Sequence, residues 1–281
     1  MTNVQSRRRF DSTISSGYVA VDFCNEVGIG ARLVWCLHVL AYCDSHELAA
    51  DFRFSFPAAR DIDFFAPFFH VDGGARDTEP RGFVRAATID AVPHEVLTLA
   101  RAGDLAGKYL SPQPDVQADI DRFWSDHGLD GKVLGVHFRG TDKTDEAPRV
   151  EYETVGRYVR DYLFEHSETS AIFVSSDERR FVEYAAATFG DISVVYREDF
   201  RRAETLQPVH TNLDAVLEIQ RDAVLNCLLL ARCNALIKTA SFLSAFSALL
   251  NPEMRTFIMN RPNERALWFP EREMLAAQTN L

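Results

Sequence analysis

The stretch VLGVHFRGTDK, residues 133–143, decides the fold of this chain. Its first six residues are nearly all apolar and predict a buried strand, and Arg139, Gly140 and Lys143 come directly after it. In open parallel α/β sheets, ligands bind at the carboxyl ends of the strands. A guanidinium fork suits a phosphate, an ammonium adds a mobile point charge, and glycine lets the backbone approach closely. The stretch therefore predicts a parallel sheet with a diphosphate site at this edge.

Composition is that of an ordinary globular protein. The 281 residues are 47% hydrophobic and 25% charged, enough for one large core or two smaller ones. A formal net charge of −11 argues against a nucleic-acid or anionic-membrane surface, because proteins that bind those show a basic excess. The five cysteines form no CxxC pair, so we expect reduced core cysteines and no metal site.

No stretch predicts a membrane span. No window reaches ~18 uninterrupted apolar residues, which a transmembrane helix requires. We therefore expect a soluble, cytoplasmic protein. The sequence gives no indication of the oligomeric state.

The first half begins with a βαβ unit. An apolar strand at 18–24 runs through the turn NEVGIG, residues 25–30, into a helix at about 31–43, and a second strand follows at 48–54. Gly28 and Gly30 make a turn that either faces a ligand with its amides or only starts the helix. The aromatic run FFAPFF, residues 64–69, predicts core beneath a loop.

The second half alternates strands and helices, as a Rossmann-like parallel sheet does. After the opening strand we expect helices at 152–166, 178–189, 213–231 and 241–250, and strands at 171–175, 192–196, 235–238 and 256–259. The two halves join near residue 128. They predict a two-domain α/β protein with a cleft between the domains, 1–128 and 129–265, and a last helix in 266–281 that packs back on the first domain.

Three polar loops converge at the carboxyl edge of the second sheet in this interpretation. They are RGTDK, SSDE at residues 175–178 and TASFLS at residues 239–244. Hydroxyls and free amides at the start of the last helix would bind an anion without a cation. Taken alone, SSDE is better explained as a Ser or Asp cap of the helix that starts at Glu178, and Ser241 is also explained as a cap. Their joint occurrence favours a nucleotide diphosphate.

These segments resemble the GDP-fucose-dependent fucosyltransferases. GVHFRGTDK, then Glu146, SSDE and LLLARCNALIKTASFLSAFSALL (residues 228–250) are most similar to the α-1,6 enzymes, including the rhizobial nodulation fucosyltransferases, with protein O-fucosyltransferases as more distant relatives. The resemblance covers roughly 110–250 and, more weakly, the turn GIGARL. It implies a GT-B fold with two Rossmann-like domains facing a cleft, a glycan-type acceptor on the first domain and GDP-fucose as donor substrate on the second. It also implies inversion at the anomeric centre, with no obligatory cofactor or metal.

The resemblance places the donor site around an HxRxxD motif. His137 and Arg139 fall on its first two positions, and Arg139 is expected to hold the β-phosphate of GDP-fucose. Asp142 is the aspartate of the motif, and Lys143 matches a lysine that follows it in the α-1,6 enzymes.

Further positions come from the resemblance outside this motif. Asp177 falls on an acidic residue expected near the guanine base, and Ser241 falls on a small hydroxyl motif that contacts the phosphates. Gly28 and Gly30 match the glycine turn of the first domain more weakly.

The chain departs from the family pattern in three places. Gly140 stands where the common HxRRxD motif has a second arginine. Asn226 replaces an aspartate of the long helix, with Asp222 one turn earlier as a candidate substitute. Ala31 follows Gly30 where the usual GxGN turn has asparagine. Such changes indicate altered donor choice or a weakened enzyme.

Transfer requires a stabilised leaving diphosphate and an acceptor hydroxyl placed opposite it. The first task is assigned to Arg139 and Lys143. A carboxylate that deprotonates the acceptor is expected from Glu146, which follows the motif as in the α-1,6 enzymes, or from Glu26 on the facing loop. His137 either packs beneath the loop or touches the sugar.

Two other functions remain open. One is a transferase for another GDP-sugar such as GDP-mannose. The other is a non-catalytic GDP-sugar-binding protein on the same scaffold, which Gly140 and Asn226 make conceivable. A glycosidase with paired carboxylates fits poorly, because it leaves the basic loop unexplained.

Overall fold

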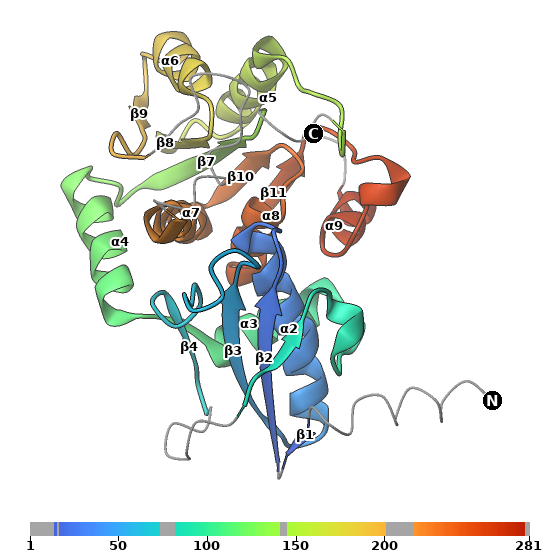
Figure 1. The fold of residues 1–281 in the computed structure, drawn as a ribbon. Helices are drawn as coiled ribbons and strands as arrows, with labels where there is room; N and C mark the ends of the chain where they lie inside the picture. Colours follow the sequence, from blue (N-terminus) through green and yellow to red (C-terminus); the bar gives the residue numbers. More distant parts are fainter. Residues whose placement is uncertain (1–13, 16, 74–81, 141–144, 201–215, 279–281) are drawn as a thin grey trace. The chain divides into compact units, whose positions relative to one another are not determined.

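The chain divides into two compact units, Met1–Val116 and Gln117–Leu281. The computed structural model (Figure 1) describes residues 14–15, 17–73, 82–140, 145–200 and 216–278. The division falls at the start of helix α4, Pro114–Asp126, whereas the sequence placed the join near residue 128, at the other end of this helix. Residues 117–126 of α4 belong to the second unit, where Arg221 Nη2 lies 2.5 Å from Asp119 Oδ2 and the ring of Phe123 packs edge-on against Phe173.

The first unit contains the predicted βαβ element. Strand β2, Tyr18–Cys24, pairs in parallel with β3, Ala49–Ser55, and helix α2, Ile29–Ser45, connects them. Strand β5, Val84–Ala86, also pairs with β2 in parallel, and β1, Ile14–Ser15, pairs with it antiparallel. All seven residues of β2 are buried, and α2 is apolar over most of its surface, so this unit has a core of its own.

Shorter elements complete the first unit. Strands β4, Phe69–Val71, and β6, Leu110–Pro112, form an antiparallel pair, and helix α3, Leu99–Tyr109, lies between them in the sequence with a short 3₁₀ turn, Ile89–Ala91, before it. The aromatic run 64–69 is core, as predicted: its four phenylalanines are buried, and the ring of Phe65 packs on Phe52, Phe54 and Phe69.

The second unit is built on a parallel sheet of five strands, in the order β11-β10-β7-β8-β9. The strands are β7 Lys132–Phe138, β8 Thr169–Ser176, β9 Ser193–Val195, β10 Ala235–Lys238 and β11 Arg255–Ile258. Helices α5, Tyr152–Glu165, and α6, Arg179–Thr188, cover one face, while α7, Val216–Ala231, and α8, Phe242–Leu250, cover the other (Figure 1). The predicted alternation of strands and helices is confirmed.

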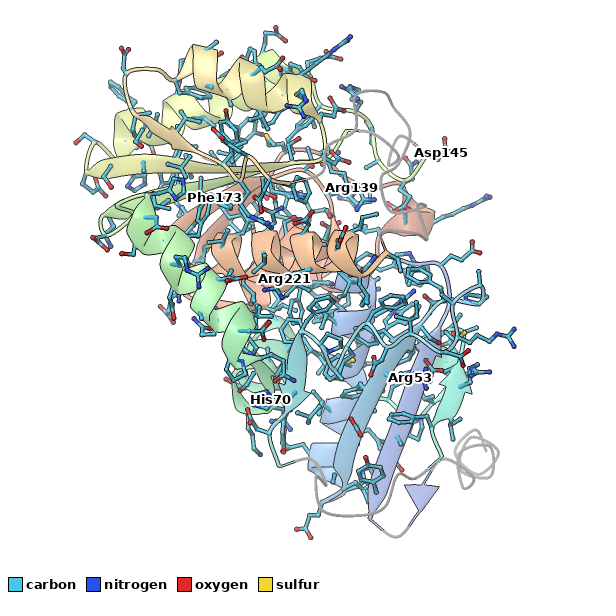
Figure 2. All side chains as sticks on the ribbon, turned by 60° about the vertical axis from the view of Figure 1, so that its left-hand side comes forward. Arg53, His70, Arg139, Asp145, Phe173 and Arg221 are labelled. Carbon is cyan, nitrogen blue, oxygen red and sulfur yellow. The ribbon has the colours of Figure 1, made fainter. Side chains whose placement is uncertain are left out.

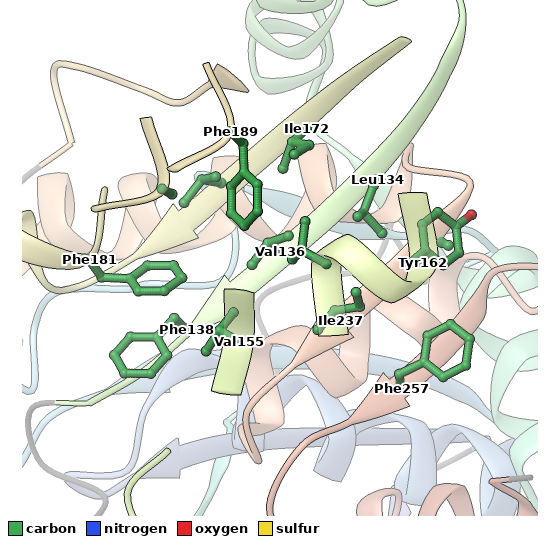
Figure 3. Packing of buried hydrophobic residues seen from close by; sticks show 14 of the residues in the cluster. Leu134, Val136, Phe138, Val155, Tyr162, Ile172, Phe181, Phe189, Ile237 and Phe257 are labelled. Carbon is green, nitrogen blue, oxygen red and sulfur yellow. The ribbon is translucent and has the colours of Figure 1, made fainter. Parts of the chain in front are cut away.

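The central strand β7 sends alternate side chains to the two faces. Leu134, Val136 and Phe138 enter the core beneath α5 and α6, where Phe181 stacks on Phe138 with ring centroids 4.3 Å apart (Figure 3). On the other face, Gly135 lets α7 approach closely, since a Cβ there would lie 3.2 Å from Leu230 Cδ2. The apolar run read from the sequence is therefore a strand buried on both sides.

The last helix, α9, Glu271–Ala277, contacts the second unit. Glu271 forms an ion pair with Lys238. Just past the helix, Gln278 Oε1 accepts the N–H of Ile258 in the edge strand β11 at 2.9 Å, and Gln278 Nε2 donates to the carbonyl of Ile258 at 3.3 Å. The packing of this helix on the first domain stays a prediction.

The five cysteines are free and buried, as predicted. Among the described residues, no helix has the length and apolar character that a bilayer crossing needs.

Candidate functional site

The carboxyl ends of β7, β8 and β10 are level and bring three loops together. His137 is the register partner of Lys238 on one side and of Ser175 on the other. Beyond them, the N–H of Arg139 donates to Thr239 Oγ1 at 2.9 Å, and the N–H of Gly140 lies 3.4 Å from Asp177 Oδ1. The predicted convergence is confirmed for the described parts of these loops, while Asp142 and Lys143 lie outside the described residues.

Arg139 stands at the end of the central strand (Figure 2). Its side chain is 24% exposed, and Nε lies 4.0 Å from Asp177 Oδ2. The hydroxyl of Thr239 fixes its backbone. Arg139 thus presents a partly desolvated guanidinium at the ligand-side edge of the sheet, where a phosphate interaction is stronger than in bulk water.

The backbone at Gly140 leaves no room for a side chain. A Cβ there would lie 2.0 Å from Glu178 Oε1 and 2.8 Å from Cε1 of Phe138. Glu178 cannot simply move aside, because Arg149 binds both of its carboxylate oxygens, at 2.8 and 2.9 Å, and Tyr152 donates its hydroxyl at 2.5 Å. The second arginine of the family motif is excluded here while this ion pair is in place.

Arg149 provides a guanidinium next to Gly140 from another part of the chain. Its Nη1 also donates to the carbonyl of Gly140 at 2.5 Å. The hydrogen bond to Glu178 raises the pKa of Arg149, and burial, followed by the bond to Glu178, raises the pKa of Tyr152 to about 12. The sequence analysis missed this cluster because it read the SSDE glutamate only as a helix start. The sequence around Glu178, SSDERR, is polar throughout and gives no local signal of its burial.

His137 is buried beneath this edge with 4% exposure, and its Nδ1 has no hydrogen-bond partner among the described residues. Burial and then the neighbouring charges of Lys238 and Arg139 hold its pKa well below 6.5. The imidazole is therefore neutral at physiological pH.

The start of α8 already binds an anion of the chain itself. The N–H of Ser241 donates to Glu271 Oε1, and Lys238 Nζ lies 2.5 Å from the same oxygen. Ser241 is the N-cap residue of α8, but its hydroxyl does not cap the helix and is buried without a hydrogen-bond partner in the described part of the chain. The sequence predicted a free amide here, whereas the structure places a carboxylate on it.

Helix α7 carries Asn226, which replaces the aspartate of the family pattern, and Asp222, the candidate substitute, and the two side chains have different environments. Asp222 forms an ion pair with Arg197 at 3.0 Å, so its charge is committed to a cation that follows β9. Asn226 is buried, and its Nδ2 has no hydrogen-bond partner within the segments that the structure describes. The side-chain amide of Asn226 is therefore a buried donor that is unsatisfied within the described structure.

In the first unit, the glycine turn opens helix α2. Gly28 is its N-cap residue with φ −65° and ψ 156°, and Gly30 is buried in the first turn. Glu26 is exposed. The turn is fixed by Arg32, a residue that sequence analysis missed, whose Nε and Nη2 donate to Oδ1 and O of Asn25 at 3.1 and 2.7 Å.

Arg32 is buried to 1% exposure, and its guanidinium lies 4.5 Å from the ring centroid of Phe56. Burial lowers its pKa to about 10, which leaves it charged at neutral pH. The signal in the sequence was a cation in the first turn of an otherwise apolar helix.

Glu146, the first candidate base, is exposed in the second unit. Its carbonyl accepts the N–H of Asn263 at 2.7 Å, and Asn260 Nδ2 donates to the carbonyl of Pro148 at 2.8 Å. The segment that carries Glu146 is therefore held against residues 260–263. Within the described residues, no group of three or more His, Cys, Asp or Glu side chains forms a metal site.

Comparison with known proteins finds similar proteins both by sequence and by fold. No protein-family model matches the chain. Over 170 residues it is 26% identical to nodulation protein Z of Bradyrhizobium diazoefficiens, in an alignment that takes in 56% of this chain and 45% of that protein. The chain thus matches less than half the length of this relative.

Solved fucosyltransferases share the fold. The Bradyrhizobium α-1,6-fucosyltransferase NodZ soaked with GDP-fucose is similar over 85% of this chain and 94% of its own, with TM-score 0.56 and 13% identity. POFUT1 in complex with GDP has a TM-score of 0.56 and 10% sequence identity, over 86% of this chain and 98% of its own. A mutant of Arabidopsis thaliana FUT1 in complex with GDP has a TM-score of 0.57 and 11% sequence identity, over 95% of this chain and 76% of its own.

These likenesses confirm the predicted fold class, α/β of the GT-B type. The predicted resemblance to GDP-fucose-dependent fucosyltransferases is confirmed in fold and, over 170 residues, in sequence. The cleft between the domains stays a prediction.

Proposed function

We propose that this chain is an inverting, metal-independent glycosyltransferase that transfers fucose from GDP-fucose to a hydroxyl group of a glycan-type acceptor. One observation carries the proposal: Arg139, fixed by Thr239, directly follows the central strand of a fold shared with a fucosyltransferase that was soaked with GDP-fucose. The five free cysteines fit a reducing compartment, so a cytoplasmic location is part of the proposal.

The chemistry follows from the charges at this edge. The guanidinium of Arg139 lies where the β-phosphate of the donor binds and balances the negative charge that develops as GDP leaves. Asp177, on the neighbouring loop, accepts from the guanine base. Lys143 and Asp142 are assigned to the same donor site because they match the motif of the fucosyltransferases.

The acceptor hydroxyl has to lose a proton as it attacks the anomeric carbon. We assign this step to Glu146, with Glu26 of the first unit as the second candidate. Both carboxylates are exposed and so can reach a bound acceptor.

The decisive experiment is Arg139→Ala with the matched control Arg122→Ala, an exposed arginine of α4 in the same unit. We expect Arg139→Ala to weaken GDP binding and transfer by about 10²-fold or more, the effect of removing a charged donor to the leaving group. Its melting temperature should stay close to that of the parent. Near-normal turnover with GDP-fucose in this variant would refute the assignment.

The base is tested by Glu146→Gln and Glu26→Gln. The variant that removes the base should lose turnover by about 10²-fold or more while GDP affinity stays unchanged, because the carboxylate acts on the acceptor and not on the donor. A normal rate for Glu146→Gln together with a low rate for Glu26→Gln would move the role to the first unit.

A second candidate function is GDP-sugar binding without transfer. It is favoured by the closed backbone at Gly140 and by the carboxylate on the Ser241 amide, which remove two phosphate contacts of the family pattern. A screen of GDP-fucose and GDP-mannose with acceptor and with water separates the cases. GDP binding without transfer or donor hydrolysis would establish the binding protein, and turnover of GDP-mannose alone would change the donor.

A further inference from the structure

Glu271, the first residue of α9, makes a buried contact with two groups beside the donor edge. Its Oε1 accepts from the N–H of Ser241 and lies 2.5 Å from Lys238 Nζ. The side chain of Lys238 has no exposure and that of Glu271 only 9%. Because removing one member of a buried ion pair leaves an uncompensated charge, this contact is strongly held.

The other end of α9 is also attached to the sheet. The amide side chain of Gln278 bonds to both backbone groups of Ile258, the last residue of the edge strand β11. Since β11 pairs with β10 in register, with Ile258 opposite Lys238, α9 is tied to two neighbouring strands at the same edge. The position of Glu271 is therefore set by the sheet.

The loop between β10 and α8 has an acceptor for each of its amides. Thr239 donates to the carbonyl of His137 at 3.0 Å, and Ala240 donates to Asn260 Oδ1 at 2.7 Å. Ser241 donates to Glu271. This same loop holds the backbone of Arg139 through the hydroxyl of Thr239.

We propose that Glu271 is a positioning residue of the donor site, an inference that rests on the proposed function. Its carboxylate fixes the Ser241 end of the loop and neutralises Lys238, so that Thr239 stays in place to orient Arg139 toward the diphosphate. It follows that the Ser241 amide is a structural donor in this chain, and that the helix after residue 270 is part of the GDP-binding unit.

The test is the double variant Lys238→Met/Glu271→Met, which replaces the ion pair by apolar groups. Such replacements commonly preserve stability, so the melting temperature should stay near that of the parent. We expect the dissociation constant for GDP to rise about tenfold, as expected when a charged hydrogen bond that orients a ligand group is lost. The KM for GDP-fucose should rise with it. Glu264→Met, at an exposed glutamate outside α9, is the matched control.

Two results would overturn the inference: unchanged GDP affinity in the double variant, which means a purely structural pair, and tighter GDP binding, which means that the carboxylate competes with phosphate. A second comparison covers a double variant that does not fold. Glu271→Gln retains an acceptor oxygen, so its GDP affinity should lie between those of the parent and Glu271→Ala, and equal affinities in all three contradict the role. A parent chain that does not bind GDP refutes the proposed function itself and this inference with it.

Discussion

Gly140 shows how one missing side chain is coupled to an ion pair elsewhere in the chain. Its Cβ position is occupied by Glu178, which is held by Arg149 and Tyr152. The residue is a glycine for reasons of space, and its φ is not in the left-handed region. Where the family motif has its second arginine, the Gly140 carbonyl accepts a hydrogen bond from an arginine nine positions later in the chain.

This coupling predicts the effect of Gly140→Ala. The added methyl group collides with Glu178 and with the ring of Phe138, so we expect a loss of about 1–3 kcal/mol in the free energy of unfolding, typical of overpacking, together with weaker GDP binding. Urea denaturation and calorimetric titration measure the two effects. Gly107→Ala, on helix α3 with nothing within 4 Å of the new atom, is the control and should be neutral or slightly stabilising. An equally harmless Gly140→Ala would contradict the packing argument.

His137 predicts a pH dependence of stability. Its pKa in the folded protein is well below the unfolded value of about 6.5, so below that pH the unfolded chain binds a proton that the folded chain does not. The histidine therefore lowers stability progressively as pH falls below 6.5, by up to about 1.4 kcal/mol per pH unit.

The measurement is urea unfolding between pH 5 and 7.5. His137→Gln should flatten the decline in unfolding free energy on the acid side, and the same change at the exposed His46 is the control for replacing a histidine. Parallel pH profiles for the parent and His137→Gln would show that the buried imidazole already takes up a proton in the folded state.

At the scale of elements, the turn before α2 depends on a single buried cation. Arg32 satisfies two oxygens of Asn25, and Oδ1 of Asn25 in turn accepts the N–H of Val27 at 3.1 Å. These contacts hold the segment that carries Glu26. In the family pattern, the asparagine of this turn follows the second glycine. In this chain Asn25, the first residue of the turn, stabilises it instead.

Arg32→Met should therefore lower the free energy of unfolding by about 2 kcal/mol or more, because two oxygens of the partly buried Asn25 lose a charged donor. Amide exchange at residues 25–28 should accelerate. GDP affinity should remain that of the parent, since Arg32 lies in the first unit and the donor site in the second. Arg60→Met, an exposed arginine of the same unit, controls for loss of charge. A large loss of GDP affinity would contradict the assignment of the donor to the second unit.

The elements that sequence predicted best are those with a strong period. The apolar runs at β7, β8 and β10 fixed the strand ends, and with them the meeting of Arg139, Asp177 and Thr239. The buried ion pairs had no such signal. Glu178 and Arg149 are 29 positions apart and Lys238 and Glu271 are 33 apart, so their pairing depends on tertiary packing that periodicity does not encode. The short strands β1, β4, β5 and β6 were missed because two or three residues show no period.

At the scale of the whole molecule, the formal charge of −11 makes the local arrangement of cations decisive. A diphosphate approaches an acidic chain against its overall field, so affinity must come from Arg139 and groups next to it. Each unit also has its own buried core, so a ligand can stabilise one unit more than the other.

This division predicts where GDP stabilises the protein. Because a ligand that binds only the folded form adds stability by mass action, GDP at 100 times its dissociation constant should add about 2.7 kcal/mol to the unit that binds it. Hydrogen exchange measured with and without GDP should show slower exchange in β7, β10 and α8, while β2 and α2 of the first unit exchange at unchanged rates. UDP at the same concentration is the control for a general nucleotide effect, and equal protection by both nucleotides would contradict recognition of guanine. Protection confined to β2 and α2 would instead place the nucleotide on the first unit and remove Arg139 from the donor site.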